Sequence, residues 1–223
     1  MDILSYFDFE PAGRRLEDLE TPVPIIDIDV AERNLRRWQE RCDKAGLANR
    51  PHIKTHKLVP LAKAQIDLGA KGITVQKLGE AEVMADAGIT DMLLTFNVVG
   101  EHKLGRLADL AKRTAIKVVA DNAALLEGLS HAAKLAGRDI EVLVECDTGA
   151  ARNGVQSPQA AIALAQAIDR TPGLSFGGLM MLPKNGARGA MAQFLDTARE
   201  GLTKSGLAVP AVSAGAPPET WKR

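Results

Sequence analysis

The sequence predicts an α/β protein built as a (β/α)8, TIM-like barrel. Short apolar runs typical of buried strands alternate with Ala-, Leu- and Lys-rich stretches of helical period. Strands that alternate with helices form right-handed βαβ units around a parallel sheet, and eight such units close a barrel. The second candidate, an open doubly wound sheet, usually carries a glycine-rich first turn, and the sequence has no GxGxxG or GxxxxGK[ST] motif.

The expected elements follow in order along the 223 residues. Residues 1–22 mix proline, glycine and charged residues without a period, so we expect an N-terminal extension; residues 23–223 are expected to form the barrel. The first strand is predicted in TPVPIIDID, before a helix from Val30 to about Lys44. Seven further strands are predicted in HIKT, GITV, DMLLTF, AIKVVA, DIEVLVEC, LSFGGLMML and PAVSA. Because the sequence ends soon after PAVSA, we expect the barrel to be incomplete at its C-terminal end.

Composition argues against several classes of partner. The chain has 28 Lys+Arg and 28 Asp+Glu, so its net charge of zero provides no basic field for nucleic acid. No window approaches the roughly 20 apolar residues of a membrane-spanning helix, and no signal peptide is recognisable. Cys42 and Cys146 form no CxxC motif and are expected to be reduced core residues. These features predict a cytoplasmic protein without nucleic-acid or membrane partners.

The segment RPHIKTHK is the first candidate site. As a strand, its period of two places His52, Lys54 and His56 on one face. Barrel strands are largely buried on both faces, and a buried lysine loses its charge readily, which yields the neutral amine that forms a Schiff base. The two histidines have no third ligand nearby and therefore predict no metal site.

A second candidate lies at the end of DIEVLVECD. Alternation places Glu145 and Asp147 on one face at the C-terminal end of this strand, where barrel active sites are built, and Arg152 follows in the adjoining loop. Two interpretations stay open. The two carboxylates either take part in a functional site, or they pair structurally with Arg152 or cap a turn.

The sequence resembles a known family over nearly all of residues 20–221. The segments TPVPIIDIDVAERNL, RPHIKTHK, GITVQKLGEAEVMADAGITDMLL, VECDTGAARNGV and VSAG occur in the order seen in the D-threonine aldolase and D-serine dehydratase group. The resemblance implies an N-terminal barrel of the alanine racemase type that binds pyridoxal phosphate, with Lys54 as the Schiff-base lysine and His52 as a neighbour of the cofactor. It also implies that Arg152 faces the pyridine nitrogen. Since arginine keeps its proton, that nitrogen would stay unprotonated and the ring would be a moderate electron sink.

The same resemblance implies a phosphate site in the loop after the last strand. Ser213, Gly215 and Ala216 are the expected contacts. Three departures weaken the match. Ala216 and Pro217 stand where relatives carry a second glycine and a hydroxyl residue, and Leu182 stands where they carry a tyrosine. Relatives continue into a C-terminal β domain that supplies ligands for a divalent metal such as manganese. We expect that domain, and any metal site, to be absent from these residues.

The function implied is a pyridoxal-phosphate-dependent lyase that cleaves D-β-hydroxy amino acids by a retro-aldol reaction. Without the C-terminal domain, we expect its activity to be impaired. Three alternatives stay open: a D-serine dehydratase-like enzyme, a non-catalytic pyridoxal-phosphate-binding or homeostasis protein, and a subunit that has lost the cofactor. The expected partners are a D-amino acid substrate and either a second copy of the chain or a complementing C-terminal domain.

Overall fold

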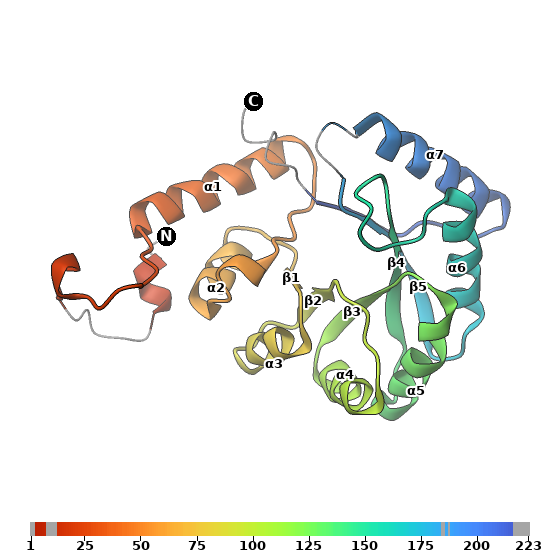
Figure 1. Cartoon of the computed structure of the whole chain (residues 1–223), viewed down its shortest axis with the longest axis horizontal. Helices are drawn as coiled ribbons and strands as arrows, with labels where there is room; N and C mark the ends of the chain where they lie inside the picture. The colour runs from red at the N-terminus through yellow and green to blue at the C-terminus, as the bar shows by residue number, and fades with distance from the viewer. Residues whose placement is uncertain (1–2, 8–12, 184–185, 187, 216–223) are drawn as a thin grey trace. The chain divides into compact units, whose positions relative to one another are not determined.

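The computed structural model describes residues 3–7, 13–183, 186 and 188–215. The chain divides into two compact units, residues 1–74 and residues 75–223. Figure 1 shows the elements of both units.

The first unit is helical. Its elements are η1 (Ile3–Tyr6), η2 (Leu16–Asp18), α1 (Ile28–Lys44), η3 (Ile53–Thr55) and α2 (Val59–Asp67). A small apolar cluster joins η1 to α2 through Ile3, Leu61 and Ala64. A buried polar network fastens the end of α1 to the segment after it. In this network the Trp38 ring N–H and the Gln39 side-chain oxygen bind the Asn49 amide at 3.2 and 2.9 Å.

The strand predicted in TPVPIIDID is wrong. No strand forms there, and the helix predicted from Val30 begins at Ile28. Pro22 and Pro24 have no N–H to donate to a sheet. The Asp27 side chain then accepts a hydrogen bond from the Val30 N–H at 2.9 Å, which caps α1 and ends the extended segment.

The strand predicted in HIKT is also wrong. Residues 53–55 form the short 3-10 helix η3, and only His52 keeps a parallel bridge, to Thr74. The physical reason is local. The His52 Nδ1 atom accepts from the Lys54 backbone N–H at 3.3 Å, a side-chain bond that competes with sheet pairing. His52, Lys54 and His56 therefore do not share a strand face, and Lys54 is exposed rather than buried.

The other six predicted strands are present. They are β1 (Ile73–Val75), β2 (Asp91–Leu94), β3 (Ala115–Ala120), β4 (Ile140–Cys146), β5 (Leu174–Met181) and β6 (Val212–Ala214), and β1 spans the boundary between the two units. Between them run α3 (Leu78–Asp86), α4 (Glu101–Arg113), η4 (Ala123–Leu125), α5 (Leu126–Ala136), α6 (Pro158–Arg170) and α7 (Arg188–Lys204).

The sheet order supports the barrel rather than the doubly wound alternative. The strands pair in the sequential order β1-β2-β3-β4-β5-β6, and the pairings from β2 to β6 are parallel. A doubly wound sheet reverses direction at a switch point, whereas a barrel adds each strand beside the last. No such reversal occurs among the six described strands.

The two faces of the sheet in the second unit carry different side chains. Helices α3 to α7 lie along one side of the sheet (Figure 1). Val118, Val142 and Val144 are fully buried and share one face of their strands. On the other face, Leu93, Val119 and Leu143 form a cluster with Met180. This opposite face corresponds to the interior of a barrel, and its polar ends are where a site is expected.

Candidate functional site at the carboxyl ends of the strands

The strands of the second unit place their carboxyl ends along one edge of the sheet. Because the strands are parallel, the segments that follow β2, β3, β4 and β6 meet at this carboxyl edge. The segment after β4 is the longest of the fully described ones, at residues 147–157, and contains Arg152. The carboxyl edge is therefore the place to look for a ligand site in this unit.

Backbone hydrogen bonds close the loop after β4. The Asp147 N–H donates to the Val155 carbonyl at 3.0 Å, and the Val155 N–H donates to the Glu145 carbonyl at 2.8 Å. Inside the loop, the Asp147 Oδ1 atom accepts the backbone N–H groups of residues 149–151 at 2.9, 2.8 and 3.2 Å. Of the two interpretations of Asp147, the structure supports the turn cap.

The residue before Arg152 has an uncommon backbone conformation. Ala151 has φ of +53°, in the left-handed region that residues with a side chain rarely enter. The three hydrogen bonds to Asp147 hold the chain in this conformation. Such strain persists only where the surroundings enforce it, and it concentrates at functional loops. The Arg152 side chain itself is exposed.

Glu145 is the buried acid of the carboxyl edge. Its side chain is only 6% exposed, and it accepts a hydrogen bond from the Asn153 amide through Oε1. Desolvation is the largest influence on the pKa of Glu145 and raises it, and the Asp121 charge also raises it. The Asn153 hydrogen bond and the Arg152 charge lower this pKa. The net effect is a raised pKa. Among the described residues Glu145 is therefore bonded to Asn153, and the structural pairing with Arg152 that the sequence left open is not formed.

A second polar group follows β2 and β3. The Asp121 carboxylate accepts the Asn97 side-chain amide at 2.8 Å and the Asn122 amide at 2.7 Å. Sequence reasoning missed these residues. The available signal was their position, since Asn97 and Asp121 come directly after the predicted strands DMLLTF and AIKVVA, at the end where barrel sites are built.

Three buried polar atoms at the carboxyl edge lack a hydrogen-bond partner among the described residues. They are Asn97 Oδ1, Glu145 Oε2 and Thr148 Oγ1. An unsatisfied buried polar group costs about 1–3 kcal/mol, so a bound polar ligand or water at such a site is favoured. These atoms mark the carboxyl edge as a place that suits a small polar ligand.

The predicted phosphate loop is partly described. Ser213 lies in β6, and the Gly215 N–H donates to the Met181 carbonyl at 3.0 Å, so this N–H belongs to the sheet. A Cβ at Gly215 would lie 2.4 Å from Leu182 Cδ1, which shows that Leu182 packs directly over the glycine. Ala216 and Pro217 lie outside the described residues.

The remaining predicted residues belong to the first unit. His52 caps η3, and Lys54 follows within it. His56 accepts the Leu58 N–H through Nδ1 at 3.0 Å, and burial lowers the pKa of this imidazole. His52 and Lys54 thus belong to one unit, and Arg152, Ser213 and Gly215 belong to the other.

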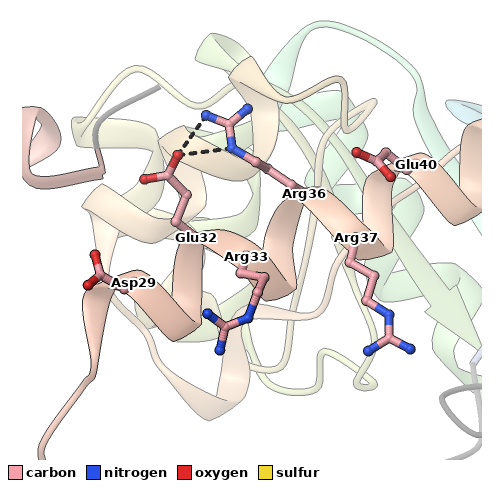
Figure 2. A pocket seen from close by; sticks show the side chains of 6 residues that line it. All are labelled: Asp29, Glu32, Arg33, Arg36, Arg37 and Glu40. Carbon is pink, nitrogen blue, oxygen red and sulfur yellow. Dashed lines mark hydrogen bonds and ion pairs between the residues drawn. The ribbon is translucent and has the colours of Figure 1, made fainter.

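A pocket of about 460 Å³ lies elsewhere in the first unit, against α1. Figure 2 shows its six labelled side chains, three acidic and three arginines, all from this one helix. Arg36 and Glu32 form an ion pair at 2.6 Å, and the six formal charges cancel. The pocket contains none of the predicted site residues, and its balanced charge favours no particular ligand.

The described residues include no group of three or more His, Cys, Asp or Glu side chains arranged to hold a metal ion. None of their helices is both long enough and apolar enough to cross a membrane. Cys42 and Cys146 are buried free thiols, as expected, and burial raises the pKa of Cys146 to about 12.

Comparison with known proteins decides the family. Residues 26–220 match the family described as alanine racemase, N-terminal domain. The chain belongs to this family. The match also confirms the predicted fold class, a barrel of the alanine racemase N-terminal type.

Curated relatives of this alanine racemase N-terminal domain include lyases that act on hydroxy amino acids. A D-threonine aldolase from Arthrobacter sp. is 42% identical over 75% of this chain and 44% of its own length. A D-threo-3-hydroxyaspartate dehydratase from Delftia sp. is 36% identical over 90% of this chain and 56% of its own length. The chain thus spans about half the length of these relatives.

Solved structures agree with the curated relatives. D-threonine aldolase from Filomicrobium marinum matches with a TM-score of 0.83 and 36% identity, covering 89% of this chain and 57% of that one. The Delftia D-threo-3-hydroxyaspartate dehydratase matches with a TM-score of 0.78 and 35% identity, covering 92% and 57%. The resemblance inferred from RPHIKTHK and the other segments is confirmed.

Proposed function

We propose that this chain is the cofactor-binding barrel of a pyridoxal-phosphate-dependent lyase that acts on D-configured β-hydroxy amino acids. The observation that carries the proposal is its similarity to a D-threonine aldolase, at 42% identity, together with the segments RPHIKTHK and VECDTGAARNGV. The three buried polar atoms without partners at the carboxyl edge fit a small polar ligand there. The residue types present, a lysine amine, an arginine and a small-residue loop, are the donors that this cofactor requires.

Lys54 is proposed to bind the cofactor covalently. Its exposed Nζ must lose a proton before it can attack the cofactor aldehyde. His52 fixes the backbone next to this lysine by accepting the Lys54 N–H. The side chain can therefore move while its attachment point in η3 stays in place.

Arg152 is proposed to hold the cofactor ring. Bound pyridoxal phosphate supplies an electron sink for the bond that breaks at Cα. A guanidinium donates a hydrogen bond to the ring nitrogen but keeps its own proton, which limits the strength of that sink. The closed loop from Asp147 to Val155 restricts where Arg152 can reach.

Ser213, Gly215 and Ala216 are proposed to lie at the phosphate. The Ser213 hydroxyl is a suitable donor, whereas the Gly215 N–H is already used by the Met181 carbonyl. Gly215 would then contribute through its lack of a side chain, since a Cβ there would strike Leu182.

A dehydratase is the second candidate, favoured by 36% identity to the D-threo-3-hydroxyaspartate dehydratase over 90% of this chain. The two reactions give different products. Retro-aldol cleavage of a D-β-hydroxy amino acid yields glycine and an aldehyde or oxoacid, whereas dehydration yields a 2-oxoacid and ammonia. The product, rather than the rate, therefore separates them.

The experiment is a product assay on the purified chain with pyridoxal phosphate and manganese. D-Threonine, D-serine and D-threo-3-hydroxyaspartate are supplied in turn, and glycine and ammonia are both measured. We expect glycine as the excess product, with none formed by Lys54→Arg. Ammonia in excess would favour the dehydratase. Covalent cofactor binding without either product, both from the chain alone and with the C-terminal domain of a D-threonine aldolase supplied in trans, would favour the non-catalytic alternative.

A further inference from the structure

The turn that follows Lys54 has an uncommon backbone. The N–H groups of His56 and Lys57 both donate to the Ile53 carbonyl, at 3.2 and 2.7 Å. Lys57 has φ of +55°, in the left-handed region that residues with a side chain rarely enter. The next N–H, that of Leu58, donates to the His56 Nδ1 atom at 3.0 Å. The His56 side chain therefore closes this turn.

The bond from Leu58 decides which ring nitrogen of His56 carries the proton. Burial lowers the pKa of this imidazole, so the ring is neutral at neutral pH. A neutral ring that accepts through Nδ1 must carry its hydrogen on Nε2. The Nε2 atom is itself buried and has no hydrogen-bond partner among the described residues. His56 therefore presents a buried N–H donor that needs an acceptor.

Helix α2 of the same unit offers the complementary acceptor. Gln65 lies in α2, and its Oε1 atom is also buried and without a partner in the described part of the chain. After burial, hydrogen bonding to the Gln65 side chain is the largest influence on the pKa of His56, and it raises that pKa. The two side chains are therefore neighbours. Buried polar groups left unsatisfied are costly, and one hydrogen bond between these two atoms satisfies both.

We propose that His56 donates from Nε2 to Gln65 Oε1, and that His56, held between the Leu58 N–H and α2, is a positioning residue for Lys54. The role of Lys54 toward the cofactor rests on the proposed function, whereas the hydrogen bond does not. His52 holds the Lys54 N–H on one side of η3, and His56 holds the turn on the other. A backbone fixed in advance loses less conformational freedom when the cofactor binds, which favours binding.

The first test needs no cofactor. NMR measures the chemical shifts of the imidazole nitrogens at neutral pH, and the histidines other than His56 serve as internal controls. We expect the His56 Nε2 atom to be protonated and Nδ1 not, and its Nε2 shift to change in Gln65→Leu. A proton on Nδ1, or an Nε2 shift that Gln65→Leu leaves unchanged, would overturn the hydrogen bond.

A change of charge at Gln65 gives the same test a second variant. Gln65→Glu keeps the Oε1 acceptor but adds a negative charge that favours the protonated ring, so the titration midpoint of His56 should move upward. Lys63→Gln is the matched control, because it changes the net charge by the same amount at an exposed position of α2. A midpoint that moves equally in both variants would overturn the pairing.

The positioning role is tested by a double-mutant cycle on pyridoxal phosphate affinity, followed by the absorbance of the Schiff base. His56→Asn keeps a side-chain acceptor for the Leu58 N–H but does not reach Gln65. We expect His56→Asn and Gln65→Leu each to weaken binding about tenfold, and the double variant to bind no more weakly than the weaker single variant. Circular dichroism shows that each variant is folded at the assay temperature, so lost stability alone does not change the affinity.

The outcomes separate this proposal from the proposed function. If the wild-type chain forms the Schiff base but the folded variants bind as tightly as it does, or their effects multiply, the positioning role is wrong and the proposed function stands. If the NMR test succeeds but the wild-type chain forms no reducible bond to pyridoxal phosphate, the proposed function and the positioning role fail together, and the hydrogen bond between His56 and Gln65 stands.

Discussion

Asp147 shows how one carboxylate can set the shape of a loop. Burial disfavours the charged form of Asp147. Four hydrogen bonds favour that form and outweigh burial, so the pKa of Asp147 lies below its usual value. The donors are the backbone N–H groups of Gly149, Ala150 and Ala151 and the side chain of Gln156. The sequence placed this acid at the carboxyl end of a strand. It could not show that one oxygen would collect three backbone N–H groups, because that depends on the left-handed turn at Ala151.

Replacing Asp147 should therefore destabilise the chain. Asp147→Ala leaves the N–H groups of residues 149–151 without their acceptor, and we expect the free energy of unfolding to fall by about 1–3 kcal/mol. Asp147→Asn keeps an Oδ1 acceptor and should lose less. Urea unfolding followed by circular dichroism gives both values. Equal losses in the two variants would show that hydrogen bonding to Oδ1 is not what holds the loop.

The pKa of Glu145 is raised in the folded chain, whereas that of Asp147 is lowered. Glu145 therefore predicts that its contribution to the free energy of unfolding falls as pH rises. A raised pKa means that the folded state binds the proton more tightly than the unfolded state, in which a glutamate titrates near about 4.3. The stabilising contribution is complete below the unfolded pKa and is lost as pH rises through the folded pKa. Glu145→Gln carries no such charge. Its free energy of unfolding relative to wild type should therefore increase from pH 4.5 to pH 8.

Urea unfolding of wild type and Glu145→Gln at four pH values across this range measures that difference. Glu141→Gln serves as the control, because Glu141 lies on the same strand but its carboxylate is paired with Lys117. A difference for Glu145→Gln that stays constant or falls with pH would contradict the assignment of a buried, partly unsatisfied carboxylate.

At the scale of elements, the sequence predicted strands well where burial alone decides. The six apolar runs from GITV to PAVSA all form strands, and β2 to β5 each lie between two neighbours in the sheet. It failed at HIKT and TPVPIIDID, where side-chain acceptors decide instead. His52 and Asp27 each bind a nearby backbone N–H, and apolar periodicity carries no information about such bonds.

Glycine substitutions in the loop after β4 test how tightly this element is built. Gly149 and Gly154 both have positive φ, of +105° and +109°. A Cβ at Gly149 meets nothing within 4 Å, whereas one at Gly154 would lie 2.6 Å from the Asp147 nitrogen. Gly149→Ala should cost about 1–2 kcal/mol of strain, and Gly154→Ala should cost at least about 1 kcal/mol more.

Thermal and urea unfolding of these two variants gives the comparison. The positive φ is common to both, so the difference between them isolates the contact of Gly154 with the β4 backbone. If Gly154→Ala is no less stable than Gly149→Ala, the loop is not packed against Asp147 as described.

At the scale of the whole molecule, the fold class was predictable and the site only in part. Consecutive βα units with no switch point specify the barrel type. The candidate residues were found because strand ends and the RPHIKTHK and RNGV motifs are visible in one sequence. Three polar residues of the carboxyl edge were not found from the sequence. Asn97 and Thr148 are notable only because each has a buried oxygen without a hydrogen-bond partner among the described residues. Asn153 is notable only because its amide donates to Glu145.

The function proposed for the whole molecule depends on one lysine. Lys54 and Lys57 lie three residues apart in the same segment. Arginine at either position keeps the positive charge but cannot form a Schiff base. The pair Lys54→Arg and Lys57→Arg is therefore matched, and only the first should abolish covalent attachment of the cofactor.

The most direct test is to incubate the chain with pyridoxal phosphate, reduce it with borohydride, digest it and locate the modified lysine by mass spectrometry. We expect one modified peptide, carrying the label on Lys54, in the wild-type chain and in Lys57→Arg, and no stoichiometric label in Lys54→Arg. A stoichiometric label on another lysine, or one retained by Lys54→Arg, would contradict the assignment of Lys54 and the function built on it.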